Sequence, residues 1–298
     1  MKTFFVLLKR NIKLFFNDKG MFLTSLITPL ILLLLYATFL GNVYKQSFIQ
    51  IFPSELIIPE KVINGLVGGQ LMSSILAVSC VTVAFCSNFL SVQDKVSGSV
   101  NDFTISPVKS IHLSLSYYLS SLLSTLIICI TGTLICFIYL AITGWYLTFM
   151  DVVSFLLDVV LLSLFGTILS SIVNCFIKTP GQMSAVGTMV SSTYGFICGA
   201  YMPVASFPMW LQKVLSFLPG TYGTSLMRNH AMNGAIYTLQ KEGLEQEYID
   251  TLRDELDCRI YFNGQMVEEV YKYLILIGSI LILICIYLLL MSKKGKRA

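Results

Sequence analysis

Long apolar stretches separated by short polar segments dominate the chain. A helix needs about 20 mainly apolar residues to cross the hydrocarbon of a bilayer. Six segments qualify, namely 21–40, 66–90, 113–140, 152–176, 183–202 and 271–291. Ser, Thr and Gly dilute the apolar character of 183–202. The pattern predicts an all-α polytopic membrane protein with six transmembrane helices, built as a single transmembrane domain over 1–298.

Composition agrees with the bilayer as the main solvent. Hydrophobic residues make up 55% of the 298 residues and charged residues only 12%, whereas a soluble domain carries about 25% charged residues. Seven of the eight cysteines lie in apolar stretches, where Cys behaves as a small hydrophobic residue. Only Cys258 lies in a polar region, so a disulfide framework is not expected.

The basic residues predict the topology, because Lys and Arg concentrate in short loops on the cytoplasmic side. With the N-terminus inside, the inside segments hold twelve Lys or Arg residues, and the short outside loops hold only Lys45 and Lys61. We therefore expect a multi-pass protein of the cell membrane with both termini cytoplasmic. No small-residue cleavage site follows Leu40, so the first span is expected to be retained.

Residues 1–20 show a helical repeat of apolar and basic positions. Six apolar residues cover one half of a helical wheel: Phe4, Phe5, Leu8, Ile12, Phe15 and Phe16. Lys2, Lys9 and Lys13 line the edge of the other half. This pattern predicts an amphipathic helix in the membrane interface. A positive anchor that sets the topology is compatible with it.

Segment 92–112, between the second and third spans, is polar and longer than a minimal turn. Ser97-Gly98-Ser99 can break one helix and cap the next, and Pro107 ends whatever precedes it. Val100 and Phe103 would share one face of a short surface helix suited to docking in a groove. Physical reasoning alone favours an ordinary connecting loop.

The run from Gly98 to Val108 nevertheless resembles the cytoplasmic motif of type-2 permeases of ATP-binding-cassette exporters, which ends in Ser-Pro-Val or Ser-Pro-Ile. It departs by Ser99 for Thr, Asn101 for an acidic residue and Phe103-Thr104 for an aliphatic pair. In that family the segment is the coupling helix that contacts the ATPase. The resemblance thus implies ATPase-coupling contacts from Gly98, Ser99, Val100, Asn101, Asp102, Phe103, Ser106 and Pro107.

Small residues recur every four positions along 183–202, at Gly187, Ser191, Gly195 and Gly199. Such a stripe lets two helices approach closely, because van der Waals contact drives helix association in lipid. It predicts a helix interface, either within the chain or between subunits.

The outer segment 203–270 begins with an apolar stripe at helical spacing over 207–218, too short to span but suited to a re-entrant or interfacial hairpin. This segment also resembles the type-2 permeases. A Pro is followed by a Pro-x-Trp-Leu helix, then by an aromatic residue before a further Pro, a Thr-Tyr pair and a Leu-x-Arg, in that order. The resemblance implies an outer hairpin that contains Pro203, Pro208, Trp210, Pro219, Tyr222 and Arg228.

Residues 233–269 form a longer insertion than that family usually has. From Lys241 to Glu269 there are nine acidic and three basic residues, and apolar residues repeat every four positions from Leu244 to Ile260. The pattern predicts an amphipathic helix. It is either a cap that attracts cationic substrates or, more simply, a solvated surface helix.

The sequence contains no phosphate-binding loop, no catalytic acid–base set and no Cys/His spacing typical of a metal site. No catalytic, cofactor-binding or metal residue is therefore expected, and the chain is not expected to be an enzyme by itself. Asp158 is the one acid inside a predicted span. It is a candidate cavity residue, although a shallow hydrated position explains it as well.

Together these features predict the permease subunit of an exporter that moves an amphipathic or hydrophobic substrate, such as a drug, an antimicrobial peptide or a lipid. The expected partners are two copies of an ATP-binding-cassette ATPase, which would bind ATP and Mg, a second permease subunit, identical or related, and membrane lipid, with no nucleic acid. Alternatives are a lipid-linked glycan permease of the same architecture and an ion-coupled secondary transporter, although the paired repeats typical of the latter are not evident.

Overall fold

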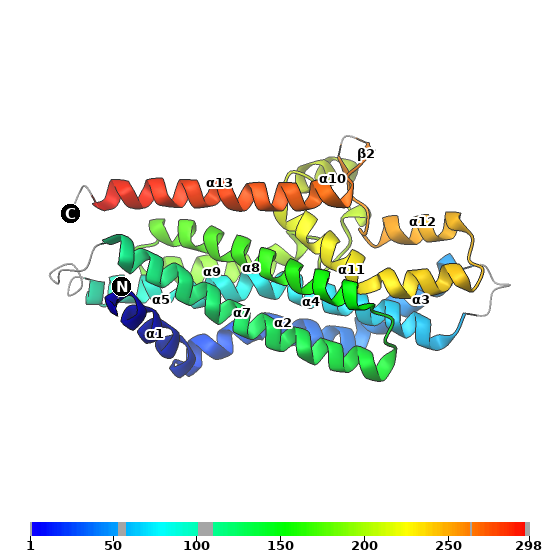
Figure 1. The fold of residues 1–298 in the computed structure, drawn as a ribbon, viewed down its shortest axis with the longest axis horizontal. Helices are drawn as coiled ribbons and strands as arrows, with labels where there is room; N and C mark the ends of the chain where they lie inside the picture. Colours follow the sequence, from blue (N-terminus) through cyan, green and yellow to red (C-terminus); the bar gives the residue numbers. More distant parts are fainter. Residues whose placement is uncertain (1, 53–57, 101–109, 263, 296–298) are drawn as a thin grey trace.

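The computed structural model describes residues 2–52, 58–100, 110–262 and 264–295, and these are almost entirely helical (Figure 1). The first half contains α1 Lys2–Asn17, α2 Lys19–Leu35, the π-helical turn η1 Tyr36–Leu40, α3 Gly41–Ile51, α4 Glu60–Asn88, α5 Leu90–Val96 and α7 Ser110–Thr143. The second half contains α8 Phe149–Phe176, α9 Pro180–Ile197, the 3₁₀ turn η2 Val204–Ser206, α10 Met209–Leu215, α11 Pro219–Lys241, α12 Gln246–Glu255, β1 Tyr261–Phe262, β2 Gln265–Met266 and α13 Glu269–Gly295.

Five helical segments of the described chain are long and apolar enough to cross a membrane: Lys19–Ile51, Glu60–Val96, Ile111–Thr143, Phe149–Phe176 and Glu269–Met291. This confirms the all-α polytopic class. The predicted span 183–202 corresponds to α9, a helix of 18 residues. α9 does not qualify as a sixth candidate span, because Ser, Thr and Gly lower its apolar content. The small antiparallel pair β1–β2 was not predicted.

The first long helical segment extends beyond its predicted end. Asp18 separates α1 from α2, because its side chain accepts a hydrogen bond from the Met21 backbone N–H at 3.0 Å and so caps α2. From there the helix continues through η1 and α3 to Ile51, rather than ending at residue 40. The segment is therefore longer than the hydrocarbon requires.

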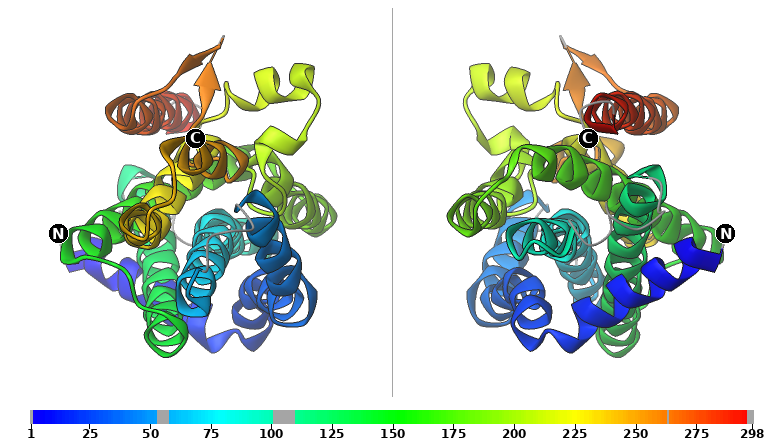
Figure 2. Two further views of the ribbon diagram at one scale, coloured as in Figure 1. Left: turned by 90° about the vertical axis from the view of Figure 1, so that its right-hand side faces the viewer. Right: turned by 90° about the vertical axis from the view of Figure 1, so that its left-hand side faces the viewer.

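α4 is the central helix of the bundle. Almost every residue from Val62 to Asn88 is buried, and Figure 2 shows α4 enclosed by its neighbours. Its contacts are mainly with α2, α7, α8, α9 and α11. Close packing depends on glycine, because a Cβ on Gly69 would lie 2.7 Å from the Ala231 carbonyl oxygen of α11.

Both termini lie at one end of the bundle, here called the terminal end, and the opposite end is called the distal end (Figure 1). α1 runs obliquely across α7 at the terminal end, whereas α3, α11 and α12 reach the distal end. α13 runs along the outside of the bundle and packs mainly on α8 and α11. The outer segment thus lies in the distal half of the bundle, with α10 beside the start of α13.

The outer segment differs from its prediction in two places. The apolar stripe over 207–218 forms only the seven-residue helix α10. The predicted helix of the insertion is shorter, since α12 ends at Glu255 and a turn with Asp257 at φ 53° leads into β1–β2. Between them lies α11, a buried helix of 23 residues that was not predicted from the sequence.

Candidate functional site

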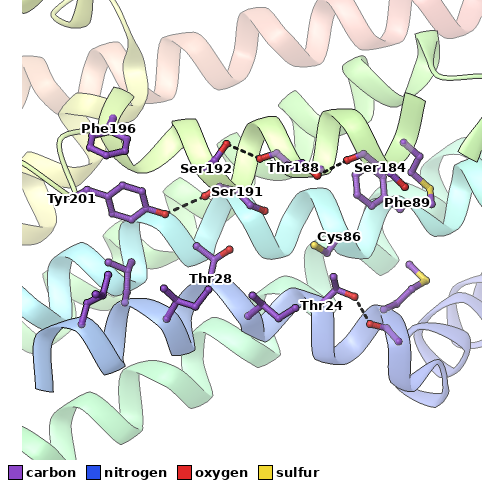
Figure 3. Close-up of a pocket in the computed structure, with 18 of the residues that line it drawn as sticks. Thr24, Thr28, Cys86, Phe89, Ser184, Thr188, Ser191, Ser192, Phe196 and Tyr201 are labelled. Atoms are coloured by element: carbon purple, nitrogen blue, oxygen red, sulfur yellow. Dashed lines mark hydrogen bonds between the residues drawn. The ribbon is translucent and has the colours of Figure 1, made fainter. Parts of the chain in front are cut away.

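A lateral groove of about 1230 Å³ runs between α2 and α9, with α4 behind it (Figure 3). Cys86 and Phe89 from the end of α4 line its back. The groove reaches from Asp18 near the terminal end to Tyr201 and Pro203 toward the distal end. The groove therefore follows much of the length of α2 and α9.

Two rows of hydroxyl groups face each other across the groove. Its hydroxyl residues on α2 and α9 are Thr24, Thr28, Ser184, Thr188, Ser191 and Ser192. Thr188 and Ser192 donate to the carbonyl oxygens four residues earlier, at 2.9 and 2.8 Å, and Thr24 donates likewise to Gly20. Because these protons are used within the helices, the oxygens are left to accept hydrogen bonds from a molecule in the groove.

The remaining lining is mostly apolar, with side chains such as Ile27, Ile31 and Met183. Among the described residues that line the groove, none is Lys, Arg or His, and Asp18 is the only carboxylate. An anionic group would therefore meet no cationic side chain there. The chemistry suits an apolar body that carries uncharged or positively charged donors.

The small-residue stripe of α9 is divided between two environments. Gly187 and Ser191 line the groove, and a Cβ on Gly187 would lie 3.1 Å from the Phe89 ring. Gly195 packs against the ring of Tyr201, whose hydroxyl donates to the Ser191 carbonyl at 3.1 Å. Gly199 lies beyond the helix at φ +76°. Part of the stripe thus serves packing within this chain.

The three prolines expected in the outer hairpin lie at its corners, and Trp210, Tyr222 and Arg228 lie within its helices. Pro203 and Pro208 immediately precede η2 and α10, and Pro219 is the first residue of α11. Tyr222 is buried and donates to the Ser216 carbonyl at 2.6 Å. Trp210 is 67% exposed on α10. The prolines, which lack an N–H and fix φ, suit these helix starts.

Arg228 is fully buried on α11 and joins the hairpin to the insertion. Its guanidinium pairs with Asp257 at 3.0 Å and donates to the carbonyls of Leu256 and Gly199 at 3.2 and 2.5 Å. Arg228 was predicted as part of the hairpin, but Asp257 was not predicted, since no local pattern connects the two residues. A buried arginine requires an acidic partner, and that requirement was the available clue.

Asp158 does not line the groove. It is buried on α8, where it accepts a hydrogen bond from the Tyr273 hydroxyl at 2.8 Å and lies 2.6 Å from His230 Nδ1. Its position in the bundle is therefore on the far side of α4 from α2, among α8, α11 and α13.

Comparison with known proteins bears on this arrangement directly. The chain matches the family ABC-2 type transporter over residues 2–231. It belongs to that family. The ABC-2 domain is the permease subunit of ABC-2 type transporters and implies pairing with an ATP-binding-cassette ATPase. No curated protein and no solved structure matched the chain.

The predicted coupling segment of this ABC-2 permease is described only at its start. Gly98 has φ +80°, and the hydroxyls of Ser97 and Ser99 lie 2.9 Å apart, with Val100 following in a helical turn. The other five residues predicted to contact the ATPase lie outside the described residues: Asn101, Asp102, Phe103, Ser106 and Pro107. The left-handed backbone at Gly98 separates α5 from that segment.

A polar cluster in the ABC-2 permease lies next to this segment and was not predicted. Arg10 of α1 forms two hydrogen bonds to the carboxylate of Asp94 on α5, at 2.6 and 3.1 Å. Tyr117 of α7 donates to the same carboxylate at 2.5 Å. Lys95 donates to the Asn174 carbonyl of α8 at 2.9 Å. α5, which precedes the predicted coupling segment, is therefore tied to α1, α7 and α8.

Proposed function

We propose that this chain is the permease subunit of an ATP-binding-cassette exporter for amphipathic or hydrophobic molecules with uncharged or cationic polar groups. The observation that carries this proposal is the groove between α2 and α9, with its apolar lining and hydroxyl rows. A phosphate-linked glycan carries anionic groups that none of the described lining side chains would neutralise. This contrast supports the amphipathic substrate over the glycan alternative.

A second permease subunit, identical or related, would close the groove. α2 is apolar but largely uncovered, and Leu23, Ile27, Leu30 and Leu34 are exposed on it. α9, which forms the other wall, is exposed at Ser192 and Met189 as well. Two such faces would meet around a shared path, so that substrate moves between the subunits rather than through one bundle.

Energy would come from two ATPase subunits at the terminal end, which the excess of Lys and Arg assigns to the cytoplasm. Closure of the ATPases would move the coupling segment. The Arg10–Asp94–Tyr117 cluster would carry this movement into α1 and α7. A change of packing between helices then opens the groove alternately to each side.

The test uses the permease co-expressed with its ATPase and inside-out membrane vesicles. We expect the two subunits to co-purify and the vesicles to accumulate a fluorescent cationic amphiphile only with hydrolysable ATP. An anionic amphiphile of the same size is the matched probe and is expected to accumulate less. Preferential transport of the anionic probe overturns the substrate class, and accumulation without ATP overturns the mechanism.

A further inference from the structure

Three titratable side chains form a continuous row toward the distal end, separate from the groove. His230 of α11 lies between Asp158 of α8 and Glu269 of α13. Its Nδ1 is 2.6 Å from Asp158 Oδ2, and its Nε2 is 3.1 Å from Glu269 Oε1. The hydroxyl of Tyr273 donates to the other oxygen of Asp158 at 2.8 Å. Both nitrogens of one imidazole therefore face carboxylates.

Exposure falls steadily along this row. The side chain of Glu269 is 52% exposed, that of His230 is 10% exposed, and that of Asp158 is fully buried. A proton from the solvent can thus reach the inner carboxylate by passing from Glu269 to the imidazole. The row connects an aqueous surface with a carboxylate inside the bundle.

The two hydrogen bonds of the imidazole require one proton more than Asp158, His230 and Glu269 would hold at neutral pH with their ordinary pKa values. A neutral imidazole has one N–H, whereas the imidazolium has two. With both carboxylates ionised, only the imidazolium donates to both. With the proton on Asp158, the carboxyl donates to Nδ1 and the neutral ring donates to Glu269 through Nε2. Either arrangement satisfies both contacts, and both contain the extra proton.

We propose that Asp158, His230 and Glu269 form a proton-binding site open to the distal solvent, and that the bound proton fastens the start of α13 to α8 and α11. After the proton leaves, a neutral ring that donates to the buried Asp158 turns the lone pair of Nε2 toward Glu269. The contact with α13 is then lost first, because Glu269 has solvent available and Asp158 does not.

α13 depends on few other polar contacts at this end. Lys272 donates to the Ser225 hydroxyl and to the Cys258 carbonyl, at 2.8 and 2.7 Å. Its next turns expose Leu274 and Leu281 toward the surroundings of the bundle. Loss of the Glu269 contact therefore removes one of the polar connections that hold this end of α13, beside those of Lys272 and Tyr273.

The two carboxylates beside the imidazole favour its protonation. α8 contributes Asp158 and α13 contributes Glu269, Lys272 and the Tyr273 hydroxyl. On α12, Arg253 lies near Glu269 and reaches Asn233, and the charged residues of α4, Glu60 and Lys61, lie at its outermost turn. Burial opposes the charged ring, but the hydrogen bonds to Asp158 and Glu269 outweigh it and raise the pKa of His230 to about 9.

The direction of the pH effect follows from this raised pKa. Stabilisation by the site is complete below the ordinary histidine pKa of about 6.5 and is lost as pH rises through about 9. Alkaline solution should therefore release the start of α13, and acid should fasten it.

The experiment is hydrogen–deuterium exchange of the full permease in lipid nanodiscs, read as protection factors of the amides at 269–276. In the wild type, protection should fall more than tenfold between about pH 7 and about pH 9, since one proton changes the equilibrium by up to tenfold per pH unit. His230→Gln should lack this pH dependence. His112→Gln, which changes the other histidine of the chain, should keep it.

A wild-type protection that is constant over this range, or a decline that persists in His230→Gln, overturns the proposal. If His230→Gln does not fold, Glu269→Gln tests the proposal instead. Removal of the outer carboxylate should move the midpoint of the decline to lower pH, because one of the two groups that hold the proton is gone. An unchanged midpoint contradicts the site. These measurements need no ATPase or substrate, so they stand apart from the proposed export function.

Discussion

Arg228 and Asp257 form a buried ion pair between α11 and the turn after α12, with Nη1 and Oδ2 at 3.0 Å. The same carboxylate accepts hydrogen bonds from the backbone N–H groups of Val204 and of Ala205, the latter at 3.0 Å. Since Arg228 also donates to Gly199, three segments meet at this pair. They are the loop after α9, the helix α11 and the insertion.

Replacement of Asp257 by Asn should strongly destabilise the permease. Asn tolerates the positive φ of this position, so the change removes mainly the charge. It leaves Arg228 buried without its counter-ion, which costs on the order of 3–5 kcal/mol. Thermal unfolding in detergent measures the loss. Asp250→Asn, at a partly exposed ion pair with Arg259, should cost at most about 1 kcal/mol. Equal melting temperatures for the two variants would contradict this account.

The glycine at position 234 should be far less replaceable than another helical glycine. A Cβ on Gly234 would overlap the Tyr146 backbone carbonyl, whereas a Cβ on Gly278 would meet open space. Gly234→Ala should cost about 1–3 kcal/mol or more through forced backbone movement. Gly278→Ala is the control and should leave the melting temperature nearly unchanged. An unchanged melting temperature for Gly234→Ala would mean that α11 does not pack against the backbone at Tyr146.

A bulky side chain in the groove should block substrate without unfolding the bundle. Ser192 is exposed on the α9 wall, so Ser192→Trp would fill space rather than disturb the core. We expect ATPase stimulation by a cationic amphiphile in nanodiscs to fall several-fold. Leu281→Trp places the same ring on the exposed face of α13 and should retain stimulation. An equal effect of both variants would show that the groove does not bind the substrate.

Loss of the Asp94 charge should uncouple substrate from ATP hydrolysis. Asp94 accepts hydrogen bonds from Arg10 and Tyr117, and bonds to charged groups contribute about 1.5–3 kcal/mol each. Asp94→Asn should reduce substrate-stimulated ATPase activity while the ATPase still co-purifies. Lys9→Gln, an exposed change on the same helix α1, is the control. Full stimulation in Asp94→Asn would exclude the cluster from the coupling path.

Local sequence patterns predicted the long apolar helices and the corners that are marked by a proline. Apolar runs predicted the five long spans, and the prolines at 203, 208 and 219 indicated the corners of the outer hairpin. α11 was missed because a helix buried among other helices needs no apolar run of spanning length. Its small and neutral residues, such as Gly220 and Thr224, resemble a loop in composition. α9 shows the same difficulty, since its wall of hydroxyls lowers the apolar content of a helix.

The sequence by itself determined that the chain enters a bilayer, the order of its five most apolar helices, and the unusual presence of an acid at position 158. Those properties follow from the transfer of individual side chains between water and hydrocarbon. Only the tertiary structure decided that Asp158 meets His230, that Arg228 meets Asp257, and that α2 and α9 enclose a groove. Asp158 and His230 are 72 residues apart in the chain. Electrostatic contacts depend on distance in space, which no local pattern of residues contains.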